Sequence, residues 1–366
     1  MSAAFPSFEF RGSNHEIGRQ HGKQAGELVH RHLNMALGKL EAKDVDRATA
    51  RRRARLYIPF IQEHAPHFAE ELGGLSQGAE ITLEDAYILQ LRAELAVAPG
   101  EDGTEEAAMA REALAHECTT FAISGKHTAD GIPISGQNAD LPAGTRDIGI
   151  VTKIIPDDKP SLLMLTPAGQ ISYIGINNRG MAVFANFLNT GNWRAGFPRY
   201  LLSRTVLEHD SIDAALQKLA NIPRASSRNV LMMERSGRAV DMELAVEREA
   251  RLEAEDGVLA HSNHFVAPEL GDCEMSEADR HHNSCLRLDR MKELILSRSG
   301  EITPETAMEF CRDRENTPDA ICRHLGDGPG DYITFASVIA RPSEGEMWVA
   351  PGPPDQHGYT RFAFNM

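Results

Sequence analysis

Two hydrophobic patterns divide the chain. Between residues 13 and 96, apolar residues recur at intervals of three and four, the spacing of one face of an amphipathic helix. Ser13 with Glu16, and Thr82 with Asp85, have the spacing of capping boxes and predict two helix starts in this region. From residue 119 the period changes to two, as in strands, with turn signals such as Asp130-Gly131 between the runs. The pattern predicts a helical first region and a second region built mainly on strands.

The second region alternates blocks of strands with blocks of helices. Strands are expected at residues 119–124, 132–138, 148–155, 161–165, 171–174, 181–187, 229–233, 239–244, 333–340 and 347–350. Helices are expected at residues 198–209, 212–220, 277–298 and 304–313. This order favours an α+β fold with antiparallel sheets covered by helices over a doubly wound parallel sheet.

Residues 98–117 lie between the two regions and follow neither pattern. They contain six acidic residues, one basic residue and mostly small side chains, without an apolar stripe. Such a composition is typical of an exposed linker.

Charge and composition exclude several function classes. The chain has 366 residues, with 53 acidic against 38 basic side chains and a formal net charge of −15. An acidic surface repels phosphate backbones, so no nucleic-acid partner is expected. The sequence contains no long apolar run and no signal peptide, which predicts a soluble cytoplasmic protein without a membrane partner. Its oligomeric state is open, and a homo-oligomer is compatible with the sequence.

Cofactor and metal motifs are missing from the sequence. The five cysteines form no CxxC pair, and the histidines of the segment 261–264 and of the pair 281–282 lack a metal-ligand spacing. Neither a Walker loop nor a GxGxxG motif occurs. Residues 74–78 read GLSQG and match a nucleophile elbow, but the preceding HFAEEL is helical where that elbow needs a strand. We expect no cofactor and no metal.

The junction between the linker and the first strand carries the candidate chemistry. Cys118 stands directly after Glu117 and at the start of the strand TTFAI. If the bond between the two residues were cut, the free α-amine of Cys118, with a pKa of about 7.7–8.0, would serve as the base for its own thiol. A buried strand cysteine without a catalytic role is the alternative interpretation.

Motifs along the chain support the catalytic interpretation. They occur in order at residues 14–22, 91–95, 118–120, 136–140, 177–181, 185–187, 261–265, 284–290 and 334–354. Together they resemble the isopenicillin N acyltransferase family of the N-terminal nucleophile hydrolases, also classed as peptidase C45, and more distantly the choloylglycine and penicillin V amidases.

The resemblance implies an αββα four-layer sandwich and cleavage of a zymogen between Glu117 and Cys118. The products would be a helical α chain of residues 1–117, ending in the acidic linker, and a catalytic β chain of residues 118–366, which remain associated. By the resemblance, Cys118 attacks the substrate carbonyl and Asp140 holds its ammonium group. The resemblance also implies that the side-chain amides of Asn263 and Asn186 donate to the oxyanion. Thr120 would contribute a backbone N–H to the site, and Arg287 would neutralise a nearby carboxylate.

Two departures from the family pattern concern processing and substrate. Glu117 replaces a glycine found before the nucleophile in well-known members. Gln137 stands where choloylglycine hydrolases carry an arginine, which argues against an anionic substrate, and Asp147 and the net charge point to a neutral or cationic one. An apolar acyl pocket is expected from three aromatic residues, which could instead anchor a loop. These are Trp193, Phe197 and Tyr200.

The sequence therefore predicts a self-processing cysteine amidohydrolase that cleaves a small N-acyl amide through a thioester. One alternative is an acyltransferase that passes the acyl group from a thioester or amide donor to an amine. The other is an uncleaved binding or structural protein, if Glu117 blocks processing.

Overall fold

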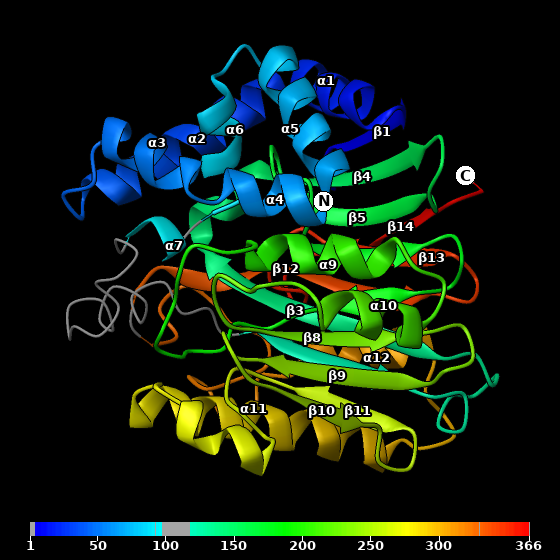
Figure 1. The fold of residues 1–366 in the computed structure, drawn as a ribbon. Helices are drawn as coiled ribbons and strands as arrows, with labels where there is room; N and C mark the ends of the chain where they lie inside the picture. The colour runs from blue at the N-terminus through cyan, green and yellow to red at the C-terminus, as the bar shows by residue number, and fades with distance from the viewer. Residues whose placement is uncertain (1–3, 92, 97–117, 329, 366) are drawn as a thin grey trace.

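Two β-sheets pack face to face between two groups of helices in the computed structural model of the chain (Figure 1). The structure describes residues 4–91, 93–96, 118–328 and 330–365. The predicted linker, residues 98–117, and the predicted cleavage residue Glu117 lie outside these ranges.

The larger sheet has eight strands in the order β1-β4-β5-β6-β7-β8-β9-β10. Its strands are β1 (Ser7–Gly12), β4 (Gly149–Pro156), β5 (Leu162–Pro167), β6 (Ile174–Asn177), β7 (Ala182–Phe184), β8 (Arg228–Met233), β9 (Ala239–Leu244) and β10 (Glu249–Glu253). All neighbouring pairs are antiparallel except β1 and β4, which run parallel with Phe10 opposite Ile154.

The smaller sheet has six antiparallel strands in the order β11-β2-β3-β12-β13-β14. Its strands are β11 (Val258–His261), β2 (Thr119–Ile123), β3 (Ile134–Pro142), β12 (Tyr332–Arg341), β13 (Glu346–Ala350) and β14 (Thr360–Ala363). Strands β2 and β3 both have a neighbour on each side, and the start of β2 is buried in the interior of the molecule.

Helices cover the outer faces of both sheets. The helices before residue 97 are α1 (Asn14–Gln24), α2 (Gly26–Glu41), α3 (Arg47–Arg55), α4 (Ile58–His64), α5 (Pro66–Gly78), α6 (Leu83–Ile88) and α7 (Ala93–Ala96). Those after it are α9 (Arg199–Leu207), α10 (Ile212–Leu219), α11 (Ala278–Ser297) and α12 (Pro304–Cys311), with 3-10 turns η1 (Ala143–Ile148) and η2 (Pro268–Cys273). In Figure 1 the first group gathers at the top and α11 lies at the bottom.

Alternation along single strands shows how the layers are ordered. In β5, Leu162 and Met164 pack into the core beneath α1–α10, whereas Leu163 and Leu165 pack into the core between the sheets. In β2, Ala122 also faces the other sheet, while its neighbours Phe121 and Ile123 pack with residues of α11 and α12. Three cores therefore separate four layers, and the predicted αββα sandwich is confirmed.

Most of the predicted elements and both predicted helix starts are confirmed. Ser13 Oγ accepts from the Glu16 N–H at 3.3 Å, and Thr82 Oγ1 accepts from the Asp85 N–H at 3.2 Å. The sequence analysis did not predict β1, β10, β11 or β14, and it placed β6 three residues early. These short strands are the four edge strands of the two sheets, and β1 pairs with a strand about 140 residues away. Pairing over such a distance leaves no local pattern.

The GLSQG segment belongs to helix α5, as the sequence analysis expected for a motif that is not an elbow. Its glycines allow α1 and α5 to touch through their backbones. A Cβ atom at Gly74 would lie 1.9 Å from the His15 carbonyl oxygen, and one at Gly78 would lie 2.1 Å from the Arg19 carbonyl oxygen. Close helix packing, not nucleophile chemistry, accounts for the spacing of these glycines.

The predicted α-chain segment is joined to the rest by buried polar contacts. Arg204 on α9 makes a two-point ion pair with Glu71 on α5, at 2.8 and 3.0 Å. Gln90 donates to the Gly169 carbonyl and accepts from the Ile171 N–H. These contacts, together with β1 in the larger sheet, would hold the two chains together after a cut.

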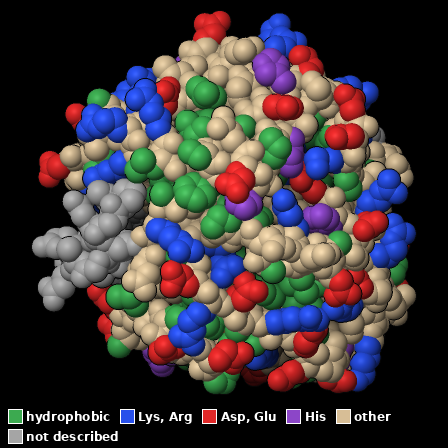
Figure 2. Space-filling view, in the orientation of Figure 1, with side chains coloured by type: hydrophobic (Ala, Val, Ile, Leu, Met, Phe, Trp, Pro, Cys, Tyr) green, Lys and Arg blue, Asp and Glu red, His purple; other side chains and the backbone are tan. Residues whose placement is uncertain are grey.

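Acidic and basic side chains are interspersed over the face drawn in Figure 2. Among the described residues, every helix is too short or too polar to cross a lipid bilayer.

Candidate active site

Cys118 lies directly before strand β2 and is buried, with 2% of its surface exposed. Side chains alternate along a strand, so Cys118 and Thr120 share the side of Ala122, which faces the larger sheet. Thr119 faces the opposite way, and its Oγ1 accepts from Arg287 on α11 at 3.0 Å. The thiol is therefore directed into the space between the two sheets.

Three side chains hold the backbone of Cys118. Its N–H donates to Asn263 Oδ1 at 2.6 Å. Its carbonyl oxygen accepts from Asn186 Nδ2 at 2.9 Å and from Arg287 Nη1 at 2.6 Å. The structure thus brings together Cys118, the predicted nucleophile, and three of the residues predicted around it, from four separate parts of the chain.

Asp140, on β3, lies beside the thiol. The distance from Cys118 Sγ to the Asp140 carbonyl oxygen is 4.0 Å. Asp140 Oδ1 accepts from Thr334 Oγ1 at 2.7 Å, while Oδ2 is buried without a hydrogen-bond partner among the described residues. An unpaired carboxylate oxygen in the interior is costly unless it is protonated or meets a cation.

The protonation of both groups follows from their burial. Burial raises the pKa of the Asp140 carboxyl to about 8, even though Arg287 and Thr334 lower it. Burial, reinforced by the negative charge of Asp140, raises the pKa of the Cys118 thiol to about 11. Near neutral pH both groups keep their protons, so Cys118 needs a base before it can attack a carbonyl.

Arg287 connects α11 to the site. Besides its bonds to Cys118 and Thr119, it donates from Nη2 to Asn263 Oδ1 at 3.1 Å and from Nε to Asn283 Oδ1 at 2.9 Å. Its planar fork of donors can serve all four acceptors at once. Among the described residues, no carboxylate forms an ion pair with Arg287, but its charge lowers the pKa of Asp140. The predicted neutralisation of a carboxylate by Arg287 stays a prediction.

The segment after β11 positions Asn263. Its N–H donates to Ser284 Oγ at 2.6 Å, and its Nδ2 donates to the Phe187 carbonyl at 2.9 Å. An amide nitrogen carries two hydrogens, so one bond to Phe187 leaves a second N–H for an oxyanion. The predicted oxyanion role of Asn263 stays a prediction.

Asn186 follows β7 and belongs to a buried polar network. Its Oδ1 accepts from Thr120 Oγ1 at 2.8 Å and from Asn229 Nδ2 at 3.2 Å. The two amide hydrogen bonds between Gln137 and Ala185 fix the preceding residue. Gln137, which replaces an arginine of related hydrolases, therefore bridges the sheets. Thr120 contacts Asn186 through its side-chain hydroxyl. The predicted role of its backbone N–H stays a prediction.

A cleft with an empty volume of about 270 Å³ adjoins the nucleophile. Its lining residues come from both sheets and from α9. They are Cys118, Tyr173, Ala185, Asn186, Phe187, Arg199, Tyr200 and Arg228.

The three predicted pocket aromatics have different positions. Tyr200 lines the cleft, and Trp193 packs edge-on against Phe187 with ring centroids 6.1 Å apart. Phe197 is fully buried in the core beneath the helices and is not among the lining residues. Its backbone N–H donates to the Pro223 carbonyl at 2.7 Å, which anchors the loop before α9.

Two arginines in the cleft wall were missed by the sequence analysis. Arg199 opens α9 directly before the predicted Tyr200, and Arg228 opens β8. One signal was available, because a charged residue heads the strand segment RNVLMM, whose other residues are uncharged and mostly apolar. A cation at the start of a buried strand needs a partner that the local sequence does not supply.

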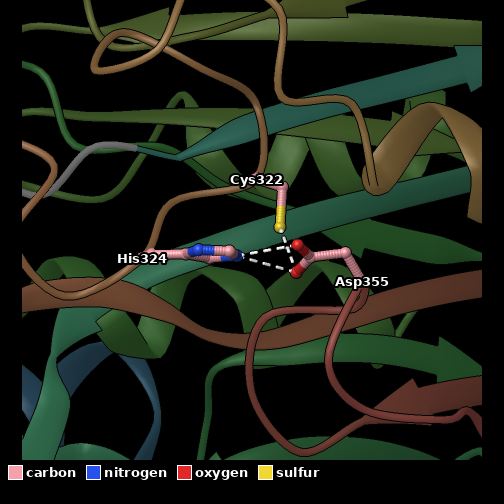
Figure 3. Close-up of side chains that lie close together, drawn as sticks. All are labelled: Cys322, His324 and Asp355. Atoms are coloured by element: carbon pink, nitrogen blue, oxygen red, sulfur yellow. Dashed lines mark hydrogen bonds and ion pairs between the residues drawn. The ribbon is translucent and has the colours of Figure 1, made fainter.

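One group of side chains among the described residues has donor atoms close enough to share a metal ion. It comprises Cys322, His324 and Asp355, which Figure 3 shows pointing toward one another. The Asp355 carboxylate accepts from the Cys322 thiol at 3.2 Å and from His324 Nε2 at 2.8 Å. Burial and the hydrogen bond to Asp355 raise the pKa of the Cys322 thiol, which opposes the thiolate that a metal requires. We interpret the group as a hydrogen-bonded cluster.

Comparison with known proteins places this geometry in context. Residues 127–356 match the family model described as acyl-coenzyme A:6-aminopenicillanic acid acyl-transferase. The chain is 26% identical over 334 residues to the 40 kDa form of acyl-coenzyme A:6-aminopenicillanic-acid-acyltransferase from Emericella nidulans, covering 90% of this chain and 87% of that protein.

Two solved structures are similar at low identity. A variant of the conjugated bile acid hydrolase from Clostridium perfringens gives a TM-score of 0.46 at 12% identity, covering 68% of this chain and 97% of the hydrolase. The penicillin V acylase from Agrobacterium tumefaciens gives a TM-score of 0.45 at 11% identity, covering 68% of this chain and 86% of the acylase.

Proposed function

This chain belongs to the acyl-coenzyme A:6-aminopenicillanic acid acyl-transferase family, and we propose that it is a self-processing cysteine amidohydrolase that cleaves a small N-acyl amide. The observation that carries the proposal is the setting of Cys118. Its thiol adjoins a cleft, its backbone is held by Asn263, Asn186 and Arg287, and an unpaired carboxylate oxygen of Asp140 lies in the same buried site.

Processing comes first in the proposed sequence. The Cys118 sulfur adds to the carbonyl carbon of Glu117, the bond from that carbon to the Cys118 nitrogen breaks, and the thiol proton ends on the nitrogen. Water then hydrolyses the thioester, which restores the thiol and leaves a carboxylate on Glu117 and a free α-amine on Cys118. The hydrogen bonds of Asn186 and Arg287 to the Cys118 carbonyl keep this residue in place throughout.

The new amine supplies the missing base. In its neutral form it accepts the thiol proton as Cys118 attacks the substrate carbonyl, and it then passes that proton to the leaving amine. The ammonium formed meanwhile gives Asp140 Oδ2 a cation partner, and this lowers the pKa of that carboxyl from its raised value. Asn263 Nδ2 donates to the oxyanion, and water hydrolyses the acyl thioester.

Acyl transfer is the second candidate, supported by the named activity of the Emericella nidulans relative. The same thioester passes its acyl group to an amine when an acceptor, rather than water, occupies the cleft. Assays of thioester donors with and without added amines separate the two functions. Products that do not change with amine exclude the transferase.

The first test is the intact mass of the purified protein and of its Cys118→Ala variant. By proportion of chain length, the parent is expected to give fragments of about 13 and about 27 kDa, the larger beginning at Cys118. The variant is expected to stay at 40.2 kDa. Cys273→Ala, which changes a half-exposed cysteine elsewhere, is the control and should process normally. A parent that stays whole would overturn the proposal and favour an uncleaved binding protein.

A further inference from the structure

Two guanidinium groups face the cleft beside the nucleophile. Arg199 and Arg228 are 2% and 3% exposed and come from different elements, α9 and β8. Neither takes part in the bonds that hold Cys118. No carboxylate is among the described residues that line the cleft.

Arg199 keeps most of its donors unused. Its Nε lies 3.5 Å from Glu94 Oε1, but Nη1 and Nη2 are buried without a hydrogen-bond partner within the described ranges. Its guanidinium carbon lies 4.8 to 5.2 Å from the ring centroids of Phe187, Trp193 and Tyr200. The aromatic faces stabilise the charge but provide no acceptor for the two NH₂ groups.

The buried charge of Arg228 has fewer stabilising contacts than that of Arg199. Nη2 donates to Ser203 Oγ at 3.1 Å, and Nε has no partner in the described part of the chain. The guanidinium lies 4.9 Å from the Tyr200 ring centroid. Burial lowers the pKa of Arg228 to about 10, and Arg199 adds to that effect as a neighbouring cation. The charge of Arg228 is thus buried and close to a like charge, and no described carboxylate pairs with it.

A buried cation of this kind destabilises a protein unless an anion meets it. Arginine forks bind carboxylates through two parallel hydrogen bonds, and unused N–H donors next to a cavity provide that arrangement. Cys118 and both arginines line the same cleft, so a carboxylate bound by the arginines would lie on the side of the thiol. A neutral or cationic substrate, as the sequence alone suggested, would provide no anion for Arg228 and no acceptor for the two NH₂ groups of Arg199.

We propose that the cleft is a carboxylate-binding site, and that the substrate amide carries a carboxylate a few bonds from the scissile carbonyl, held by Arg228 and Arg199. The inference rests on the proposed function, because it names the substrate class of the same site. Gln137 is uncharged and cannot pair with an anion. In this proposal Arg199 and Arg228 recognise the anion instead.

The kinetic test compares amides that differ only in this group. Each carboxylate substrate is paired with its carboxamide: N-acylglycine with N-acylglycinamide, and a glutaryl anilide with its glutaramide counterpart. The first pair places the carboxylate on the leaving group and the second places it on the acyl group. In at least one pair, the processed enzyme should favour the carboxylate by about 10–150-fold in kcat/KM, the range for hydrogen bonds to charged groups.

Variants separate binding from a general structural role. Arg228→Met should lose that preference through a higher KM for the carboxylate, with the carboxamide little affected, and Arg228→Lys should keep part of it. Arg194→Met, which removes an exposed arginine paired with Glu247, is the matched control and should behave like the parent. If Arg228→Met lowered kcat equally for the carboxylate substrate and its carboxamide, the proposal would be overturned. Such a result would mean that Arg228 only stabilises the thiolate of Cys118.

A binding measurement separates the proposed carboxylate site from the proposed amidohydrolase function. Glutarate is titrated into the Cys118→Ala variant by calorimetry, with and without Arg228→Lys. Binding that weakens in the double variant supports the site even if the parent never processes. Efficient processing and hydrolysis without any carboxylate preference or glutarate binding would overturn the site and leave the proposed function standing.

Discussion

Arg287 Nη1 donates to the carbonyl oxygen of Cys118 at 2.6 Å across 169 residues of sequence. The same guanidinium reaches Asn263 Oδ1, which in turn accepts from the Cys118 N–H. Helix α11 therefore acts on both sides of the Cys118 backbone, directly at the carbonyl and through Asn263 at the N–H.

Replacing Arg287 with lysine should slow self-processing and amide hydrolysis by at least about a hundredfold each, because an ammonium cannot serve the four acceptors of the guanidinium. The rate of self-processing is measured from the time course of fragment formation by mass spectrometry, and the rate of amide hydrolysis is measured as kcat. Arg298→Lys, at the exposed end of the same helix, is the control. If Arg287→Lys processed itself as fast as the parent, the Arg287 guanidinium would not be needed to position Cys118.

Asn263→Ala should lower kcat by about 10²–10³ with little change in KM, if its amide donates to the oxyanion. The measurement uses the processed enzyme and a saturating amide substrate. Asn221→Ala removes an exposed amide that bonds only within its own helix end, and it should leave both constants unchanged. A rise in KM without a fall in kcat would assign Asn263 to substrate binding instead.

Asp140 should make the uncut protein less stable as the pH rises. Burial raises its pKa from 3.8 to about 8, so between these values the folded state keeps a proton that the unfolded chain has lost. Relative to Cys118→Ala, the added substitution Asp140→Asn should therefore raise the free energy of unfolding progressively with pH, by up to about 1.4 kcal/mol per pH unit. Urea unfolding from pH 5 to pH 8 measures the difference.

The control for that experiment is Asp213→Asn. The hydrogen bond from Arg238 lowers the pKa of this exposed carboxyl, so it is ionised in both states above pH 5. Its effect on stability should therefore be constant over the same range. A flat difference for Asp140→Asn as well would mean that its carboxyl is already ionised in the folded chain.

The contact between α1 and α5 predicts opposite effects at adjacent glycines. Gly74→Ala should lower the free energy of unfolding by about 1–3 kcal/mol, because the new Cβ would meet the backbone of His15. Gly73→Ala has open space around its Cβ and should raise it by about 1 kcal/mol through helix propensity. Equal effects in denaturant unfolding would argue against the close packing of the two helices.

Local pattern in the sequence determined most of the secondary structure and the class of the fold. The continuous apolar run at residues 162–165 follows from a strand with a core on each side. The capping residues Ser13 and Thr82 act within one helical turn. The order of the motifs around Cys118, Asp140 and Asn263, through the family resemblance, was also sufficient to predict an αββα sandwich and to single out Cys118, which lies beside a cleft, among five cysteines.

Only the tertiary structure decided which distant side chains meet. The parallel pairing of β1 with β4, the bond from Cys118 N–H to Asn263, and the approach of Arg199 and Arg228 to one cleft depend on register and packing between segments far apart in sequence. No local periodicity encodes such distances. For that reason the sequence suggested a neutral or cationic substrate from its overall charge, whereas the folded chain surrounds the nucleophile's cleft with two buried cations.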